Sequence, residues 1–210
     1  MPFIVFEGLD GSGKTTCIQH LKILLEKKYH YQVLIIEGLR NSSIGQLLRQ
    51  MFLCEKKLTS VTRVWLSLAN MAQTQTELIK SALKEKKIVL TDRWLTSAYA
   101  YQVAGYQLKL SDHYFKQLMQ AFFLQPDLTF YLKIEPTEGL KRKPKDNQLD
   151  YFERRTKVYF KKVSQGYEHF FQKDLTVKSY ESTLPLRVLL NKMMAFLETR
   201  NLIKLKRSKT

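Results

Sequence analysis

Long hydrophobic runs are absent from this sequence of 210 residues. No apolar stretch approaches the roughly 20 residues that a membrane-spanning helix needs. The chain begins almost directly with an apolar segment at residues 3–6 that has the character of a strand, so we expect no signal peptide before it. We therefore expect neither a membrane span nor secretion, and we predict a cytoplasmic protein.

Cysteine is also rare, with two residues, Cys17 and Cys54. Their separation matches no zinc-ligand spacing, and two isolated thiols fit a reducing compartment, so we interpret both as structural. Internal repeats, linkers and low-complexity segments are missing as well. Because a hydrophobic content of 44% is ordinary for a folded protein, we predict one domain over residues 1–210.

Acidic residues are scarce relative to basic ones, 19 against 35, which gives a formal net charge of +16. Such an excess is compatible with binding nucleic acid, a membrane surface or phosphorylated small molecules. Basic residues gather at 141–155, where we predict a mobile lid, and in a short tail at 200–210. Since no aromatic-rich single-strand motif or reading helix accompanies the charge, we do not expect a nucleic-acid partner.

The segment 8–15, Gly-Leu-Asp-Gly-Ser-Gly-Lys-Thr, satisfies the pattern G-x-x-x-x-G-K-[ST] in full. It lies between the strand predicted at 3–6 and a helix predicted at 16–28, which is the context that a phosphate-binding loop requires. The glycines let the backbone point successive N–H groups at a phosphate, and the helix adds its positive N-terminal dipole. Lys14 would reach the β- and γ-phosphates, and the Thr15 hydroxyl would bind Mg²⁺. The alternative is a glycine-rich turn that binds nothing; the flanking elements favour a nucleoside triphosphate site.

Strand and helix patterns alternate along the rest of the chain, which predicts an α/β fold. The expected architecture is a doubly wound sandwich of the P-loop NTPase type, with a five-stranded parallel sheet flanked by helices. The predicted strands are 3–6, 32–36, 87–92, 128–132 and 175–179. The predicted helices are 16–28, 44–53, 59–84, 112–124, 136–143, 150–172 and one that begins at 185. In such a fold, ligands lie beyond the carboxyl ends of the strands.

The third predicted strand ends in Asp92-Arg93-Trp94. An aspartate at this place fits a second Mg²⁺ anchor that acts through water, and the adjoining arginine would point into the cleft. The alternative is a local ion pair that only ties the strand to the next helix.

Together these motifs resemble the thymidylate kinase family, and the resemblance runs nearly end to end. The segment 6–16 resembles the family's opening, and 40–45 is similar to its second loop. Asp92-Arg93-Trp94 with Ser97 and Ala100-Tyr101-Gln102 resembles its DRY…S…AYQ segment. Residues 126–132 and 138–142 resemble its fourth strand and following helix.

The resemblance implies ATP-dependent phosphorylation of dTMP to dTDP in dTTP biosynthesis, with Mg²⁺ as cofactor. It implies catalytic roles for Lys14, Asp92 and Arg93, and a metal site at Thr15 and Asp92. The implied ATP-binding residues are Gly8, Leu9, Asp10, Gly11, Ser12, Gly13, Lys14, Thr15 and, against adenine, Arg142. The implied dTMP-binding residues are Asp10, Arg40, Arg93, Ser97, Tyr101 and Gln102.

Two of these implied roles have simpler alternatives. Asp10 matches the residue that accepts a hydrogen bond from the deoxyribose 3′-hydroxyl, but it is also compatible with turn chemistry alone. Lys141, Lys143 and Lys145 are candidates for closing over the transferring phosphate, or else they form a solvated surface. An ionised phosphate acceptor needs charge neutralisation and alignment more than a general base.

The sequence departs from the family on the long third helix. By our alignment, Ser67 and Met71 stand where the family usually has a Phe that stacks on thymine and an Arg that hydrogen-bonds its O4. Each loss would cost ~1–3 kcal/mol, which weakens selectivity for thymine. Candidates for another stacking face are Trp65, Trp94, Tyr99 and Tyr101.

Two loops depart as well. The arginine of the second loop is displaced to Arg40. In the lid, Tyr151 stands where the family has an arginine that could stabilise the transferring phosphoryl group. Arg154 or Arg155 is a candidate to replace that arginine; alternatively, both face solvent.

Two other functions stay open. One is a related kinase with another nucleotide or a nucleoside as acceptor, for which Glu7 or Asp92 would serve as base. The other is a degenerate nucleotide-binding paralogue with a nucleic-acid or regulatory role. Salt-dependent binding of DNA or RNA without turnover of ATP would indicate it. The resemblance also implies a homodimer through helices 44–53 and 61–84; alternatively, their apolar faces pack on the sheet.

Overall fold

The structure is a computed structural model that describes residues 1–38, 40–54, 57–142 and 155–205. Most of the predicted lid, including Lys143, Lys145, Tyr151 and Arg154, lies outside this part of the chain. Residues 206–210 of the tail and the side chain of Cys54 lie outside it too. Across the described ranges, none of the helices has the length and apolar character needed to cross a bilayer.

Five parallel strands form one sheet in the order β2-β3-β1-β4-β5. They are β1 (Phe3–Glu7), β2 (Val33–Glu37), β3 (Ile88–Asp92), β4 (Leu128–Lys133) and β5 (Val177–Glu181). The three central strands are almost wholly buried, as expected for apolar strands covered on both faces. The predicted α/β sandwich with a five-stranded parallel sheet is thus confirmed.

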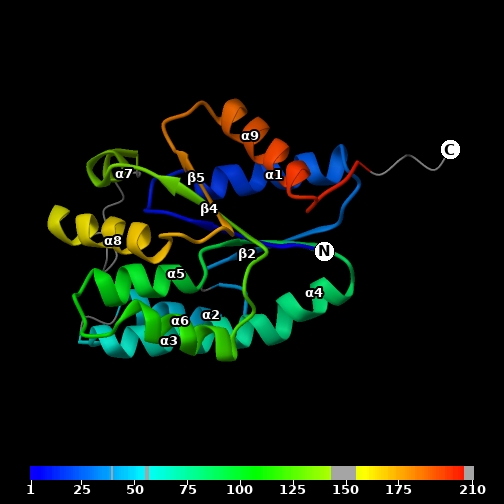
Figure 1. The fold of residues 1–210 in the computed structure, drawn as a ribbon. Coiled ribbons are helices and arrows are strands. Elements are labelled where there is room, and N and C mark those ends of the chain that lie inside the picture. The colour runs from blue at the N-terminus through cyan, green and yellow to red at the C-terminus, as the bar shows by residue number, and fades with distance from the viewer. Residues whose placement is uncertain (39, 55–56, 143–154, 206–210) are drawn as a thin grey trace.

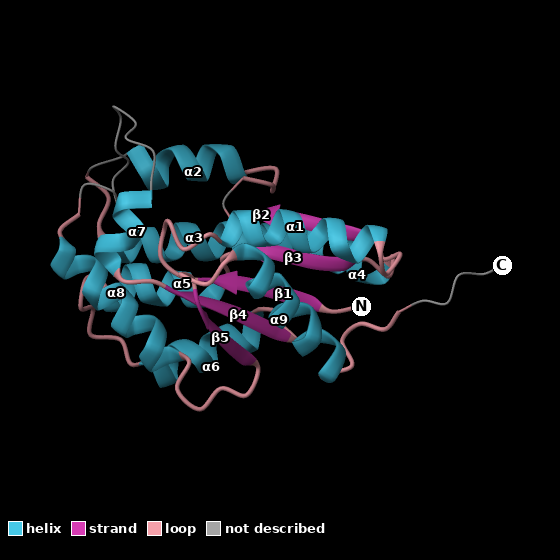
Figure 2. Cartoon of the chain, turned by 90° about the horizontal axis from the view of Figure 1, so that it is seen from above, coloured by secondary structure: helices cyan, strands magenta, loops and turns pink. Residues whose placement is uncertain are grey.

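Helices cover both faces of this sheet (Figure 1). They are α1 (Lys14–Lys27), α2 (Gly45–Cys54), α3 (Ser60–Thr74), α4 (Lys80–Lys84), α5 (Leu95–Ala98), α6 (Asp112–Phe122), α7 (Pro136–Arg142), α8 (Lys157–Phe170) and α9 (Leu186–Thr199). In Figure 1, α1 and α9 lie above the sheet, and α3, α4, α5 and α6 lie below it. Seen from above in Figure 2, α2, α7 and α8 gather at the end of the sheet where the strand arrows point.

Separate apolar clusters fill the two sides. On one side, Leu21 of α1 and Met193 of α9 pack against the alternating sheet residues Ile4 and Phe6. On the other side, residues such as Val5 pack against α3, α5 and α6. A third cluster places Tyr159, Val163 and Tyr167 of α8 against Tyr101 and Tyr131. This third cluster holds α8 near the carboxyl ends of the central strands.

The long helix predicted from residue 59 is interrupted. Thr59 caps it by accepting a hydrogen bond from the Thr62 N–H, but a π turn at Gln75–Ile79 separates α3 from α4. The Gln75 amide explains the site of the turn, because it accepts from the Leu124 N–H and donates to the carbonyl of Phe122 at the end of α6. These contacts span almost 50 residues, so the sequence pattern of the helix does not encode them.

Two further boundaries differ from the sequence prediction. α5 and a π turn at Tyr99–Ala104 follow β3 directly, where we predicted no helix. In the described part of the chain, α8 begins at Lys157 rather than near residue 150, because the Thr156 side chain caps it by accepting from the Tyr159 N–H.

Candidate active site

A cavity of about 850 Å³ opens at the carboxyl ends of β1, β2 and β3. Parallel register brings the strand ends together there, since Asp92 lies opposite Phe6 on one side and Glu37 on the other. The cavity is lined by Asp10, Gly11, Gly13, Lys14, Thr15, Thr16, Glu37, Gly38, Arg40, Arg49, Phe52, Leu53, Ser67, Met71, Asp92, Arg93, Trp94, Ser97, Ala98, Tyr101, Gln102 and Arg142. Five of these side chains are cationic and three are carboxylates, so the walls favour an anionic ligand.

The glycine-rich loop takes a backbone path that glycine makes possible. Gly11 has φ +77°, and a Cβ on it would lie 2.1 Å from the carbonyl oxygen of Gly139 on α7. Gly13, with φ +83°, caps α1, so the free N–H groups of the first turn face the cavity side of the loop. Gly8, Leu9 and Ser12 are buried behind this surface and do not line the cavity.

Lys14 is held inside the loop. Its ammonium donates to the carbonyl oxygens of Gly8 at 3.1 Å and Leu9 at 3.0 Å. Burial lowers the pKa of Lys14 to about 8, because the charged form loses its hydration. An anionic phosphate in the cavity would stabilise the charged form.

Thr15 and Asp92 are brought into contact although 77 residues separate them. The Thr15 hydroxyl donates to Asp92 Oδ2 over 2.8 Å. The other carboxylate oxygen, Asp92 Oδ1, is buried and has no hydrogen-bond partner among the described residues. An oxygen of this kind can accept from a cation or from water that a cation holds.

Arg93 occupies the centre of the site in a left-handed backbone conformation, with φ 74°. Its Nη1 donates to the Gly8 carbonyl at 2.8 Å, and its Nη2 donates to the Tyr101 hydroxyl at 3.0 Å and to Asp10. Burial alone would lower the pKa of Arg93, but Tyr101, Tyr167 and Asp10 hold that pKa well above its ordinary value. Arg93 therefore stays cationic.

Glu7 lies behind Arg93 and does not line the cavity. It is fully buried and accepts hydrogen bonds from the backbone N–H groups of Trp94 and Ser97 and from the Ser97 hydroxyl. Of the two carboxylates considered as a base for a nucleoside acceptor, Glu7 is thus enclosed and only Asp92 reaches the cavity.

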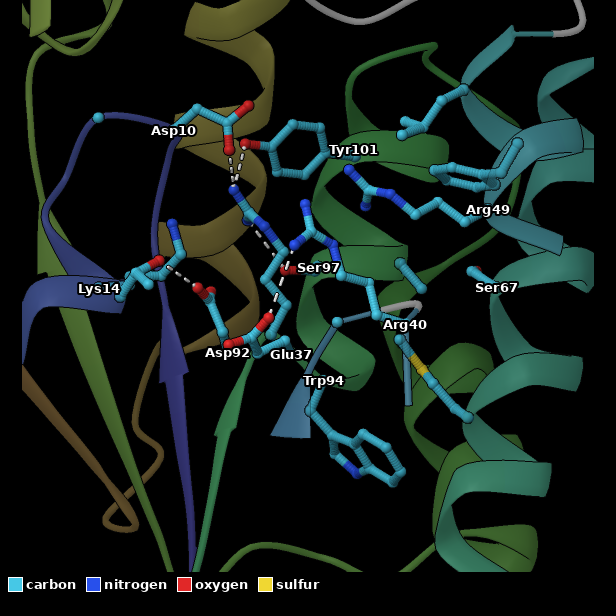
Figure 3. A pocket seen from close by; sticks show the side chains of 18 of the residues that line it. Asp10, Lys14, Glu37, Arg40, Arg49, Ser67, Asp92, Trp94, Ser97 and Tyr101 are labelled. Atoms are coloured by element: carbon cyan, nitrogen blue, oxygen red, sulfur yellow. Dashed lines mark hydrogen bonds and ion pairs between the residues drawn. The ribbon is translucent and has the colours of Figure 1, made fainter. Parts of the chain in front are cut away.

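The opposite wall comes from the loop after β2 and from α2 and α3. Arg40 forms an ion pair with Glu37 at 3.6 Å. Figure 3 shows Arg40 and Arg49 extending into the space between Asp10 and Ser67. The Ser67 hydroxyl donates to the Val64 carbonyl within its own helix at 2.7 Å.

Arg49 and Phe52 are lining residues that the sequence analysis missed. We assigned their helix to a dimer contact, and its apolar pattern gave no reason to expect a cavity wall. One signal was available, because Arg49 is the single charged residue of α2.

The other predicted residues divide between the cavity and the core. Ser97, Tyr101, Gln102 and Arg142 line the cavity. Arg142 also donates to the Ser182 carbonyl at 3.2 Å and pairs with Glu138 at 3.6 Å. Of the aromatic residues considered for stacking, Trp94 and Tyr101 line the cavity. Trp65 is exposed, whereas Tyr99 packs on Phe115 and Phe170, and neither lines the cavity.

Comparison with known proteins identifies the family. A family model described as thymidylate kinase matches residues 6–193. The chain belongs to the thymidylate kinase family. The match includes every residue that lines the cavity.

Several bacterial thymidylate kinases are similar to this chain. That of Lactobacillus helveticus (strain DPC 4571) is 33% identical over 207 residues, which cover 94% of this chain and 96% of that protein. That of Thermoanaerobacter sp. (strain X514) is 37% identical over 168 residues, 79% of this chain and 81% of that protein. That of Acholeplasma laidlawii (strain PG-8A) is 37% identical over 172 residues, 79% of this chain and 82% of that protein.

Proposed function

We propose that this member of the thymidylate kinase family transfers the γ-phosphoryl group of ATP to dTMP. An oxygen of the dTMP phosphate attacks the γ-phosphorus, and the bond from that phosphorus to the bridging oxygen of ADP breaks. The observation that carries this proposal is a single cavity that holds both the phosphate loop and Arg93. Two phosphorylated substrates bound at these two places would face each other across Asp92.

Lys14 and the loop amides would hold the phosphates of ATP. Lys14 would neutralise the γ-phosphate as it leaves ADP, and the first turn of α1 adds N–H donors and a positive dipole. Arg142 on α7 would pack on adenine, as the family resemblance implies. These groups need no rearrangement of the sheet, because all follow the carboxyl ends of the strands.

Thr15 and Asp92 fit a magnesium ion in the manner of P-loop enzymes. Mg²⁺ takes oxygen ligands and keeps several waters, and the unpartnered Asp92 Oδ1 is such an oxygen. The described residues contain no cluster of three or more His, Cys, Asp or Glu that could hold a metal ion alone, so phosphate and water oxygens would complete the shell. When bound, Mg²⁺ supplies positive charge at the phosphate oxygens.

Arg93, Arg40 and Arg49 would bind the phosphate of dTMP. Arginine pairs with phosphate through two parallel hydrogen bonds, and a nucleoside without a phosphate would lack these contacts. No general base is required, since the attacking oxygen is already ionised. Asp10 would accept from the 3′-hydroxyl, and this role requires its carboxylate to serve both the sugar and Arg93.

Ser97, Tyr101 and Gln102 would complete the nucleoside site. Gln102 is 2% exposed, and its Oε1 has no hydrogen-bond partner among the described residues. A buried amide oxygen of this kind is costly unless a ligand donates to it. The N3–H group of thymine is a suitable donor.

We also propose a cytoplasmic homodimer formed through α2 and α3. Support for the dimer comes from large apolar side chains that both helices expose. The two isolated thiols support the location. The division of the chain into one domain with a basic lid at 141–155 and a short tail stays a prediction.

The test is ADP release with ATP and Mg²⁺ across dTMP, dUMP, dCMP, dGMP and thymidine. We expect turnover with dTMP that is lost in Lys14→Ala, because that variant lacks the cation that meets the γ-phosphate. Turnover with thymidine but not dTMP would contradict the proposal and favour a nucleoside kinase. No turnover with any acceptor would favour a non-catalytic nucleotide-binding protein.

A further inference from the structure

A chain of buried polar side chains links Arg93 to Glu7. Arg93 Nη1 donates to the Tyr167 hydroxyl oxygen over 2.9 Å. That hydroxyl lies 2.7 Å from Ser97 Oγ and 3.1 Å from Glu7 Oε2, and the Ser97 hydroxyl donates to the same Glu7 oxygen. Glu7 and Tyr167 are both fully buried. Tyr167 lies on α8, which is distant in the sequence from the phosphate loop at 8–15.

Arg93 can only donate, so the Ser97 and Tyr167 hydroxyls both accept from it. Each hydroxyl can donate its one proton either to Glu7 or to the other hydroxyl. Burial raises the pKa of Glu7 above its ordinary value, and the hydrogen bond from Ser97 and the charge of Arg93 offset only part of this rise. Such a satisfied network polarises its members and holds them in one arrangement.

Close packing holds Tyr167 itself in place. Its ring lies 5.3 Å from the ring of Tyr131 and 6.3 Å from that of Tyr101, measured between centroids. The preceding residue, Gly166, lets α8 approach the π turn after α5, because a Cβ there would lie 2.5 Å from the Ala104 Cβ. The hydroxyl of Tyr167 is therefore presented to Arg93 by a rigid support.

We propose that Tyr167 is a positioning residue that orients Arg93 toward the phosphate of the acceptor nucleotide. This inference rests on the proposed function, in which Arg93 binds that phosphate. Tyr167 and Gly8 anchor Nη1, which restrains the guanidinium before the substrate arrives. Arg93 then loses less conformational freedom when dTMP binds. The gain in affinity comes from the contacts with the phosphate and does not affect the contacts with the sugar or base.

The test compares the binding of dTMP and thymidine by isothermal titration calorimetry. In Tyr167→Phe we expect the Kd of dTMP to rise about tenfold, which corresponds to about 1.4 kcal/mol. The Kd of thymidine should stay unchanged, because thymidine has no phosphate for Arg93 to bind. The KM for dTMP should rise in parallel while the KM for ATP stays constant.

Tyr131→Phe is the matched control. It removes a hydroxyl from the ring that packs against Tyr167, and that hydroxyl bonds to Ser164. We expect it to change neither Kd. Glu7→Gln gives a second route, because it replaces the carboxyl group at the end of the chain with little change in shape, and the same selective loss for dTMP should follow.

The outcomes separate this inference from the proposed function. Equal weakening of dTMP and thymidine in Tyr167→Phe would indicate a general disturbance of the site and overturn the inference. An unchanged preference for dTMP in Tyr167→Phe and Glu7→Gln would overturn it as well, while the proposed function would stand. A wild-type protein that binds thymidine as tightly as dTMP would contradict the proposed function itself.

Discussion

Lys14 illustrates how function and stability oppose each other at a single residue. A buried ammonium loses its hydration, and two carbonyl oxygens replace only part of it. This desolvation of the ammonium favours phosphate binding, because an anionic ligand offsets the lost hydration and therefore binds more tightly. Without ligand, the same charge lowers the free energy of unfolding.

Replacing Lys14 should therefore stabilise the protein in a pH-dependent way. The pKa of Lys14 is about 8 in the fold and 10.5 in its ordinary range, so the unfolded chain binds more protons between these values. Stability of the wild type then rises with pH from 8 to 10.5, and below pH 8 the full cost of the buried charge is present. We expect Lys14→Met to gain about 2 kcal/mol at pH 7, with the gain shrinking at alkaline pH.

Urea unfolding at pH 7 and at pH 10 measures this difference. Lys27→Met is the control, because Lys27 is exposed on the same helix and should show no such trend. A Lys14→Met variant that is less stable than the wild type at pH 7 would show that the two carbonyl contacts outweigh the cost of burial.

At the scale of elements, α3 gives the cavity a wall that offers few hydrogen-bonding groups to a base. Met71 is apolar, and the Ser67 hydroxyl is used within the helix. The amide of Gln102 is then the group best placed to read a pyrimidine edge, and an amide can present either its oxygen or its N–H₂. We therefore expect this site to discriminate weakly between a 4-oxo and a 4-amino pyrimidine.

We expect this wall to set the ratio of kcat/KM for dTMP over dCMP. Met71→Arg would add donors that pair with a 4-oxo group and oppose a 4-amino group, so the ratio should rise about tenfold or more. Met71→Leu, an apolar exchange of similar volume, should leave it unchanged. Steady-state kinetics with dTMP and dCMP measures this ratio. A ratio that Met71→Arg leaves unchanged would mean that α3 does not contact the base.

What the sequence could predict follows from how local each feature is. The phosphate loop, β1 and α1 are encoded by contiguous residues, so the sequence alone predicts them. The place of Asp92 is also predictable, because it ends an apolar strand. Arg49 escaped because its role depends on how α2 docks. Likewise, the Glu7–Tyr167 contact joins residues that are 160 positions apart, and no pattern along the chain records it.

At the scale of the whole molecule, exposed apolar side chains gather on α2 and α3. Leu47 on α2 is 63% exposed and Trp65 on α3 is 58% exposed, although large apolar residues are normally buried. Met51 and Val61, each one helical turn away from one of them, are exposed as well. A patch of this kind on adjacent helices marks a protein interface more often than a free surface.

The proposed homodimer should dissociate when a charge is placed in this patch. Sedimentation equilibrium of the wild type should give twice the mass of one chain, and Trp65→Glu should give the mass of one, because a buried unpaired carboxylate is costly at an interface. Leu175→Glu is the matched control, since Leu175 is 84% exposed before β5, away from α2 and α3, and should leave the dimer intact.

A wild type that sediments as a single chain would rule out the dimer and leave the patch to another partner. A Trp65→Glu variant that stays dimeric would instead move the interface to other exposed residues, such as Tyr114 and Phe122 of α6.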